Sequence, residues 1–221
     1  VRLSGPTFAA ILTIMGFSFF GKTPVNTAPI ILGVYLAGRL AGKPFKNFII
    51  IALFGTALGP LVTYLVYEAG FAGMPALLAG TVGGIVAGLG LPALAVAMLR
   101  FHQGFNLYNI GLTCGFLGLF AASMLIAARR DMDIDIVWNE KPAWRLIFLV
   151  PGMSGLYIVW GIFMDRRKTL ASLREIMKLP GRLPSDFMDM VSPGASLVNA
   201  GLLGLAGTLY LYVICAGFNG L

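Results

Sequence analysis

One short stretch, residues 101–118, gathers many of the polar side chains that could recognise a solute in this otherwise apolar chain. It reads FHQGFNLYNIGLTCGFLG and contains the only histidine, His102. Amides and hydroxyls offer hydrogen-bond donors and acceptors without a fixed charge, and such groups can replace the hydration of a small polar molecule inside a membrane. The candidate binding residues, two of them from elsewhere in the chain, are Asn26, Gln103, Asn106, Tyr108, Asn109, Thr113 and Asn199.

His102 is the residue to consider for acid–base chemistry. A lone histidine with no acidic residue near it in sequence is a poor general base, and its neighbour Arg100 favours an anchor at a membrane boundary. Phosphate-binding, zinc-protease and nucleophile motifs are absent from the sequence. Cys114 and Cys215 lie in apolar runs without metal-ligand spacing, which favours packing roles. We expect no enzyme, no metal and no cofactor; a membrane-embedded enzyme that uses His102 stays a third alternative.

The composition decides the environment in which these groups work. Hydrophobic residues make up 58% of the 221 residues and charged residues 11%, whereas soluble domains carry roughly a quarter charged residues. The mean hydropathy is +0.87. We therefore expect an all-α integral membrane protein that forms a single membrane domain over residues 1–221. The net charge of +7 is gathered in loops, which indicates membrane topology and no nucleic-acid partner.

Apolar stretches long enough for about five or six transmembrane helices follow one another. Those near 15 residues are short for a full span and favour broken or re-entrant helices. GLGLP at 88–92 is expected to break the longest stretch into a span and a shorter helix. The stretches are 6–20, 27–42, 47–68, 71–99, 105–128, 143–164 and 195–218.

Two polar segments separate the later stretches. Residues 129–142 form a polar loop of balanced charge, and residues 165–194 form a basic loop with six Lys or Arg against four acids. The positive-inside rule predicts that the basic loop is cytoplasmic. Within it, 168–180 is expected to be helical, either lying on the membrane surface or forming a plain solvated helix.

A shift of 90 residues superimposes 104–119 on 194–209 and aligns Asn109 with Asn199. This similarity predicts an internal repeat, with a first unit over 1–128 and the start of a second over 195–221. Each unit is expected to have an entry turn that carries an asparagine, followed by a helix rich in small residues. Repeats with broken helices build the sites of many transporters. The alternative is that both asparagines only cap helices. Glycine-rich faces such as 80–90 indicate close helix packing and a homo-oligomer.

Acidic groups are scarce in the apolar stretches. Glu68 is the one acidic residue there, at the end of a stretch, whereas proton- and cation-coupled carriers generally need buried carboxylates. This favours a channel-like transporter for a small uncharged or weakly polar solute, through a pore lined by broken helices. The alternative is a structural or assembly subunit of a membrane complex. The expected partners are the lipid bilayer and a small solute, in the inner membrane.

Three segments carry a resemblance to known proteins: 4–26 (SGPTFAAILTIMGFSFFGKTPVN), 101–116 and 199–220 (NAGLLGLAGTLYLYVICAGFNG). They resemble an uncharacterised family of bacterial multi-pass membrane proteins, a domain of unknown function whose members have two related halves. This implies that the chain is a fragment of a longer two-repeat protein.

GPT at 5–7 and GFNLYNIGLTCGF at 104–116 are also similar to the signature segments of the urea transporter family. No Asn-Pro precedes the first short helix, however, and Ile110 stands where that family has glycine. The resemblance implies a pore near Asn106, Tyr108, Asn109 and Thr113 but not selectivity for urea.

Overall fold

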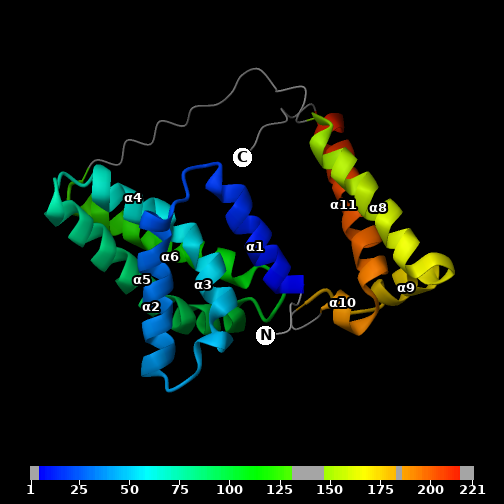
Figure 1. The fold of residues 1–221 in the computed structure, drawn as a ribbon, viewed down its shortest axis with the longest axis horizontal. Helices are drawn as coiled ribbons and strands as arrows, with labels where there is room; N and C mark the ends of the chain where they lie inside the picture. The colour runs from blue at the N-terminus through cyan, green and yellow to red at the C-terminus, as the bar shows by residue number, and fades with distance from the viewer. Residues whose placement is uncertain (1–4, 131–146, 183–185, 215–221) are drawn as a thin grey trace. The chain divides into compact units, whose positions relative to one another are not determined.

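The computed structural model describes residues 5–130, 147–182 and 186–214, and all regular elements among them are helices (Figure 1). The chain divides into two compact units, residues 1–133 and 134–221. The predicted polar loop 129–142 and Cys215 lie largely or wholly outside the described residues. Unit 1 contains α1 (Gly5–Ser18), α2 (Pro24–Leu40), η1 (Phe45–Asn47), α3 (Ile49–Gly55), η2 (Thr56–Leu58), α4 (Gly59–Tyr67), α5 (Met74–Phe101) and α6 (Asn109–Ala127). Unit 2 contains α8 (Leu149–Asp165), η3 (Arg166–Lys168), α9 (Thr169–Ile176), α10 (Phe187–Met190) and α11 (Pro193–Val213).

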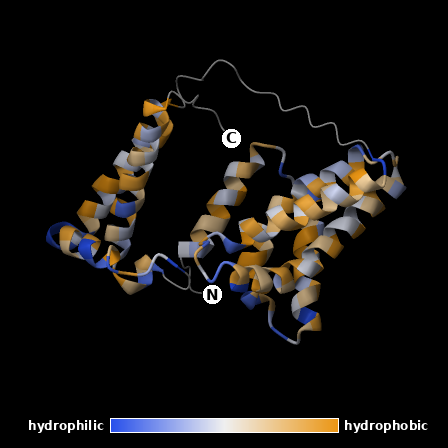
Figure 2. Cartoon of the chain, turned by 180° about the vertical axis from the view of Figure 1, so that it is seen from behind, coloured by the Kyte–Doolittle hydropathy of each residue, from blue (hydrophilic) through white to orange (hydrophobic). Residues whose placement is uncertain are grey.

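The helices are those of a membrane protein. Four segments among the described residues are long and apolar enough to cross a bilayer: Ile49–Tyr67, Met74–Phe101, Asn109–Ala127 and Pro193–Val213. Large apolar side chains cover their outer surfaces, with Val86 62% and Phe120 62% exposed. Figure 2 shows hydrophobic residues along the long helices and hydrophilic ones mainly toward their ends. Such a surface is stable against lipid and not against water.

Unit 1 is organised around the crossing of α2 and α5. Gly33 and Gly88 face each other there, and a Cβ on either would lie within 3.0 Å of backbone atoms of the opposite helix. Earlier on α5, a Cβ on Gly84 would lie 2.7 Å from the Pro29 side chain of α2 and 2.9 Å from the Val62 side chain of α4. Without side chains at these positions the backbones can approach closely, which is how helices associate in lipid. The expected packing role of the glycine-rich stretch 80–90 is confirmed.

The expected break at 88–92 is wrong. α5 is one continuous helix from Met74 to Phe101 with Pro92 in its interior. A proline removes one backbone hydrogen bond, but neighbouring helices support such positions in membrane proteins. Here Gly88 packs on α2, and Leu91, the residue before the proline, is 0% exposed. Tertiary packing therefore keeps the helix continuous through a sequence that is typical of a break.

Unit 2 is built on the pair α8 and α11, which run side by side in Figure 1. Small residues lie at their contact: a Cβ on Gly161 would meet the carbonyl of Gly194, and one on Gly201 would meet the carbonyl of Ser154. The basic loop between the two helices contains the expected helix, as α9, although it is shorter than 168–180. Its Leu170 side chain is 73% exposed.

A serine and an aspartate hold the start of α11. Ser192 is the N-cap, and its hydroxyl accepts from the backbone N–H of Ala195 at 3.0 Å while donating to the Asp165 carboxylate at the end of α8. Asp165 Oδ2 also accepts from the same N–H at 2.9 Å. The cap therefore fixes the helix end and ties it to α8.

Replacing Ser192 with alanine is expected to lower the free energy of unfolding by about 1 kcal/mol, the usual cost of losing an N-cap. Thermal stability in detergent measures the change. Ser196→Ala is the matched control, because the Ser196 hydroxyl donates one turn back, to the carbonyl of the N-cap residue, and caps no backbone N–H. Equal losses in the two variants would contradict a capping role for Ser192.

Candidate functional site

The apolar segment Ile49–Tyr67 is helical throughout, but its α-helical bonding is interrupted near its middle by a 3-10 turn; we call it the broken helix, and the turn its break. α3 ends at Gly55, a single 3-10 turn follows from Thr56 to Leu58, and α4 begins at Gly59. Pro60, in the first turn of α4, has no backbone N–H and cannot continue the bonding pattern of α3. A Cβ on Gly55 would lie 2.6 Å from the Leu91 side chain of α5, so the break packs directly on the core of unit 1.

A lysine lies against this break. Lys22, in the loop between α1 and α2, donates from Nζ to the Thr56 hydroxyl at 2.7 Å. The Thr56 hydroxyl in turn donates to the carbonyl of Leu53 at 2.6 Å, and the Thr56 residue is 0% exposed. The same ammonium lies 5.1 Å from the centroid of the Phe17 ring, a cation–π contact. The structure thus brings a half-buried cation to the middle of an apolar segment long enough to span a membrane.

Asn26 holds the loop that carries the lysine. Its Oδ1 accepts from the backbone N–H of Thr23 at 2.9 Å, and its Nδ2 donates to the carbonyl of Gly21 at 2.9 Å and to the Thr63 hydroxyl at 3.0 Å. Asn26 is buried, and these bonds join the loop to both α2 and α4. Its amide is therefore engaged within the protein, and its role in this structure is to position Lys22.

The side of the break formed by α6 is less polar. The Phe54 ring packs edge-on against Tyr108, with centroids 4.8 Å apart, and the Cys114 thiol approaches the carbonyl of Phe54 at 4.0 Å. Cys114 is 5% exposed, as its expected packing role requires. α6 therefore closes the break without adding a charged group.

The predicted motif at 101–118 forms a chain of hydrogen bonds at the turn between α5 and α6. The backbone N–H of Asn106 donates to His102 Nδ1 at 3.2 Å, which leaves the ring proton on Nε2. Nε2 then donates to Asn109 Oδ1 at 2.8 Å, and Asn109 Nδ2 donates to the carbonyl of Ala95 at 3.0 Å. The imidazole and the amide therefore bond to each other and to backbone.

Most of the other predicted binding residues lie around the same turn. Gln103 is exposed, with a φ of 53° at the turn, and Tyr108 is the N-cap residue of α6. Thr113 is fully buried and donates to the carbonyl of Asn109 at 2.8 Å. These residues lie around the α5–α6 turn, whereas Asn26 belongs to the contacts at the broken helix.

Asn199 differs from Asn109 in its position. Asn109 begins α6, but α11 begins at Pro193, so Asn199 lies inside its helix and not in an entry turn. Neither asparagine is an N-cap residue, because Tyr108 and Ser192 occupy those positions. The capping alternative is therefore wrong, and so is an entry turn that carries Asn199.

Comparison with known proteins gives a family without an assigned activity. The family described as "Protein of unknown function (DUF1576)" matches residues 1–127 and 165–221. The chain belongs to this family. Neither the curated proteins nor the solved structures contain a match to it. The matched residues include both the broken helix and the α5–α6 turn.

Sequence reasoning missed three residues of the site in this DUF1576 chain: Lys22, Thr56 and Thr63. The available signal was a lysine between two apolar stretches, in a part of the sequence that has no acid before Glu68. The Thr56 and Thr63 hydroxyls gave no signal in the sequence. Thr56 lies 34 positions from its partner Lys22, and Thr63 lies 37 positions from its partner Asn26.

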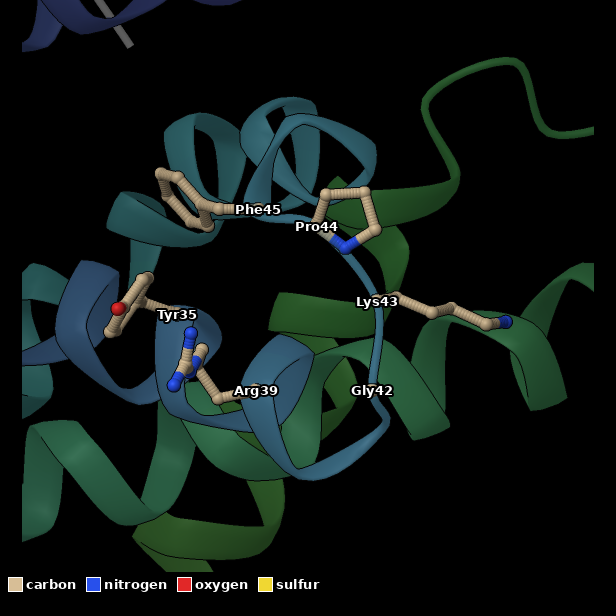
Figure 3. Close-up of a pocket in the computed structure, with 6 residues that line it drawn as sticks. All are labelled: Tyr35, Arg39, Gly42, Lys43, Pro44 and Phe45. Atoms are coloured by element: carbon tan, nitrogen blue, oxygen red, sulfur yellow. The ribbon is translucent and has the colours of Figure 1, made fainter.

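A pocket of about 370 Å³ lies elsewhere in unit 1, at the end of α2. Its lining residues are Tyr35, Arg39, Gly42, Lys43, Pro44 and Phe45. In Figure 3 the Arg39 guanidinium lies close to the Tyr35 ring, whereas the Lys43 side chain points away from the hollow. The Tyr35 and Phe45 rings pack edge-on at 5.6 Å. The pocket is a feature of the loop end, separate from the broken helix.

Proposed function

We propose that this protein is a channel-like membrane transporter that moves a small polar solute past the break between α3 and α4. The observation that carries the proposal is the hydrogen bond of Lys22 to Thr56 in the middle of an apolar segment. Ionisable groups at such depth are costly and commonly mark solute or ion pathways. Interrupted helices are also common at the solute sites of transporters.

The remaining features of the proposal come from the sequence. The basic loop 165–194 faces the cytoplasm of an inner-membrane protein, in accordance with the positive-inside rule. The glycine-lined helix contacts favour association of several copies. The predicted repeat and the urea-transporter resemblance favour a pore built from short helices, and this support is at the level of fold alone.

A structural or assembly subunit is the second candidate function. It is favoured by the chain of hydrogen bonds through His102 and Asn109, whose polar atoms bond to each other and to backbone rather than to an open path. Such a network specifies one packing arrangement. The two functions differ in one measurable property, because only the transporter moves solute by itself.

Reconstitution in liposomes separates the two functions. Stopped-flow light scattering follows vesicle volume after addition of urea, acetamide, glycerol or a small salt. A transporter accelerates the volume change for at least one solute over protein-free vesicles. Folded protein that accelerates none of them would contradict transport and leave the subunit function.

Thr56→Val tests the proposed place of the path. Valine keeps the shape of threonine but removes the hydroxyl that accepts from Lys22, a charge-assisted hydrogen bond worth roughly 1.5–3 kcal/mol. We expect flux to fall about tenfold or more while the protein stays folded. Thr208→Val is the matched control, because the Thr208 hydroxyl donates only to a carbonyl of its own helix. Equal flux in both variants would place the path elsewhere.

A further inference from the structure

The Lys22 ammonium has N–H donors that the described residues do not use. An ammonium carries three N–H groups, and one of them donates to Thr56. Within the described part of the chain, no further hydrogen-bond acceptor contacts Nζ, which also lies over the Phe17 ring. Lys22 is only half-buried, so its remaining donors are partly accessible beside the broken helix.

No acid among the described residues compensates this charge. The sequence contains no Asp or Glu before Glu68, although five basic residues precede that position: Arg2, Lys22, Arg39, Lys43 and Lys46. Glu68 lies at the C-terminal end of α4, beyond Thr63, whereas Lys22 contacts the start of the break. No carboxylate of the described residues is within ion-pair distance of Lys22. The cation is therefore without a counter-charge from the described residues of its own unit.

An uncompensated cation at membrane depth is unfavourable, since the transfer of a charge from water into a low-dielectric region is costly unless it is paired. A hydroxyl and an aromatic face reduce that cost but do not neutralise the charge. α2 begins two residues after Lys22, at Pro24. The partial positive charge of a helix N-terminus adds to the field of the lysine.

We infer that the solute bound at the broken helix is a small monovalent anion, held by the Lys22 ammonium beside Thr56. The inference rests on the proposed transport function and names its substrate class. An anion replaces the uncharged solute expected from the sequence. That expectation was based on the scarcity of acidic residues in the apolar stretches and did not consider Lys22. One lysine matches one negative charge, so the probes are monovalent anions of few atoms, chloride and nitrate.

Nitrate and urea make a sharp pair of probes, since both are small and planar and only nitrate is charged. Vesicles containing potassium-selective valinomycin swell in potassium nitrate only if the anion crosses. We expect wild-type protein to accelerate nitrate-driven swelling more than urea-driven swelling. Lys22→Met is expected to slow the nitrate-driven swelling about tenfold or more, and Lys22→Arg to keep a substantial part of it.

Lys46→Met is the matched control, because Lys46 is exposed and has the same charge; its nitrate rate is expected to equal that of wild type. Equal nitrate rates in wild type and Lys22→Met, or faster urea than nitrate transport by wild type, would overturn the anion inference and leave transport standing. If swelling instead depended on anionic lipid and not on nitrate, Lys22 would be assigned to lipid headgroups. That result would also overturn the anion inference.

Binding is measured separately from transport. Broadening of the chloride NMR line by protein in maltoside detergent, which contains no phosphate, reports an anion site even if no flux occurs. We expect broadening by wild type and by Lys46→Met, and its loss in Lys22→Met. Broadening without any flux would keep the anion site and reject transport. No difference in broadening between wild type and Lys22→Met would reject the site.

Discussion

Gly88→Leu is expected to destabilise unit 1 by about 3 kcal/mol, the upper end of the usual cost of overpacking. A Cβ on Gly88 would lie 3.0 Å from the Gly33 Cα and from the Val34 backbone nitrogen, and closer still to the carbonyl of Ile30. These are backbone atoms of α2, and they cannot rotate away as the end of a side chain can. Either α2 and α5 separate or the helix bends.

Gly90→Leu is the control for this variant. Gly90 is exposed on the same helix, and a Cβ at this position would have no atom of another residue within 4 Å, apart from its chain neighbours and its own helix backbone. Leucine has a higher helix propensity than glycine, by roughly 0.5–1 kcal/mol, so this variant is expected to be equal to wild type or slightly more stable. Resistance to unfolding by SDS measures both. Equal loss at the two positions would show that α2 does not cross α5 at Gly88.

Asn109→Leu is expected to lower the free energy of unfolding by about 2 kcal/mol. The substitution leaves the His102 Nε2–H without its acceptor and removes the bond to the carbonyl of Ala95. A donor that loses its partner costs roughly 1–3 kcal/mol when it is buried, and both residues here are half-buried. The α5–α6 turn is the segment whose order should decrease.

Asn199→Leu provides the comparison, since it has the same chemistry in a different setting. Asn199 is half-buried within α11 and makes no side-chain hydrogen bond in the described residues. Its replacement is expected to change stability by less than about 0.5 kcal/mol. A loss as large as that of Asn109→Leu would restore the equivalence of the two asparagines and strengthen the internal repeat. SDS resistance again measures the difference.

Gly88→Leu and Asn109→Leu also separate stability from transport. Gly88 and Asn109 act through packing and hydrogen bonding, so any loss of flux in their variants is expected to follow the loss of folded protein. Lys22→Met, in contrast, is expected to reduce anion flux at constant folded fraction. Measurement of flux per folded molecule therefore distinguishes the residues that build unit 1 from the residue that contacts solute.

The candidate site shows the limits of sequence reasoning most clearly. The sequence predicts Asn26 as a binding residue, and the structure places it beside Lys22, with its amide holding the loop. The sequence also predicts the turn around His102 and Asn109, but not the bond between the two side chains. Residues close in sequence predict a turn, whereas the direction of each side chain depends on helices packed around it.

The helical membrane class follows from the sequence alone, since apolar runs must satisfy their backbone within helices in lipid. The presence of glycines at helix contacts follows from it as well, as Gly33 and Gly88 show. The place where a helix breaks, in contrast, depends on tertiary contacts. Pro92 stays inside α5 because α2 and the core support it, whereas Ile49–Tyr67 breaks at Thr56, where Lys22 supplies a hydrogen bond from a distant loop. Composition and periodicity describe one segment at a time, and these outcomes depend on contacts between segments.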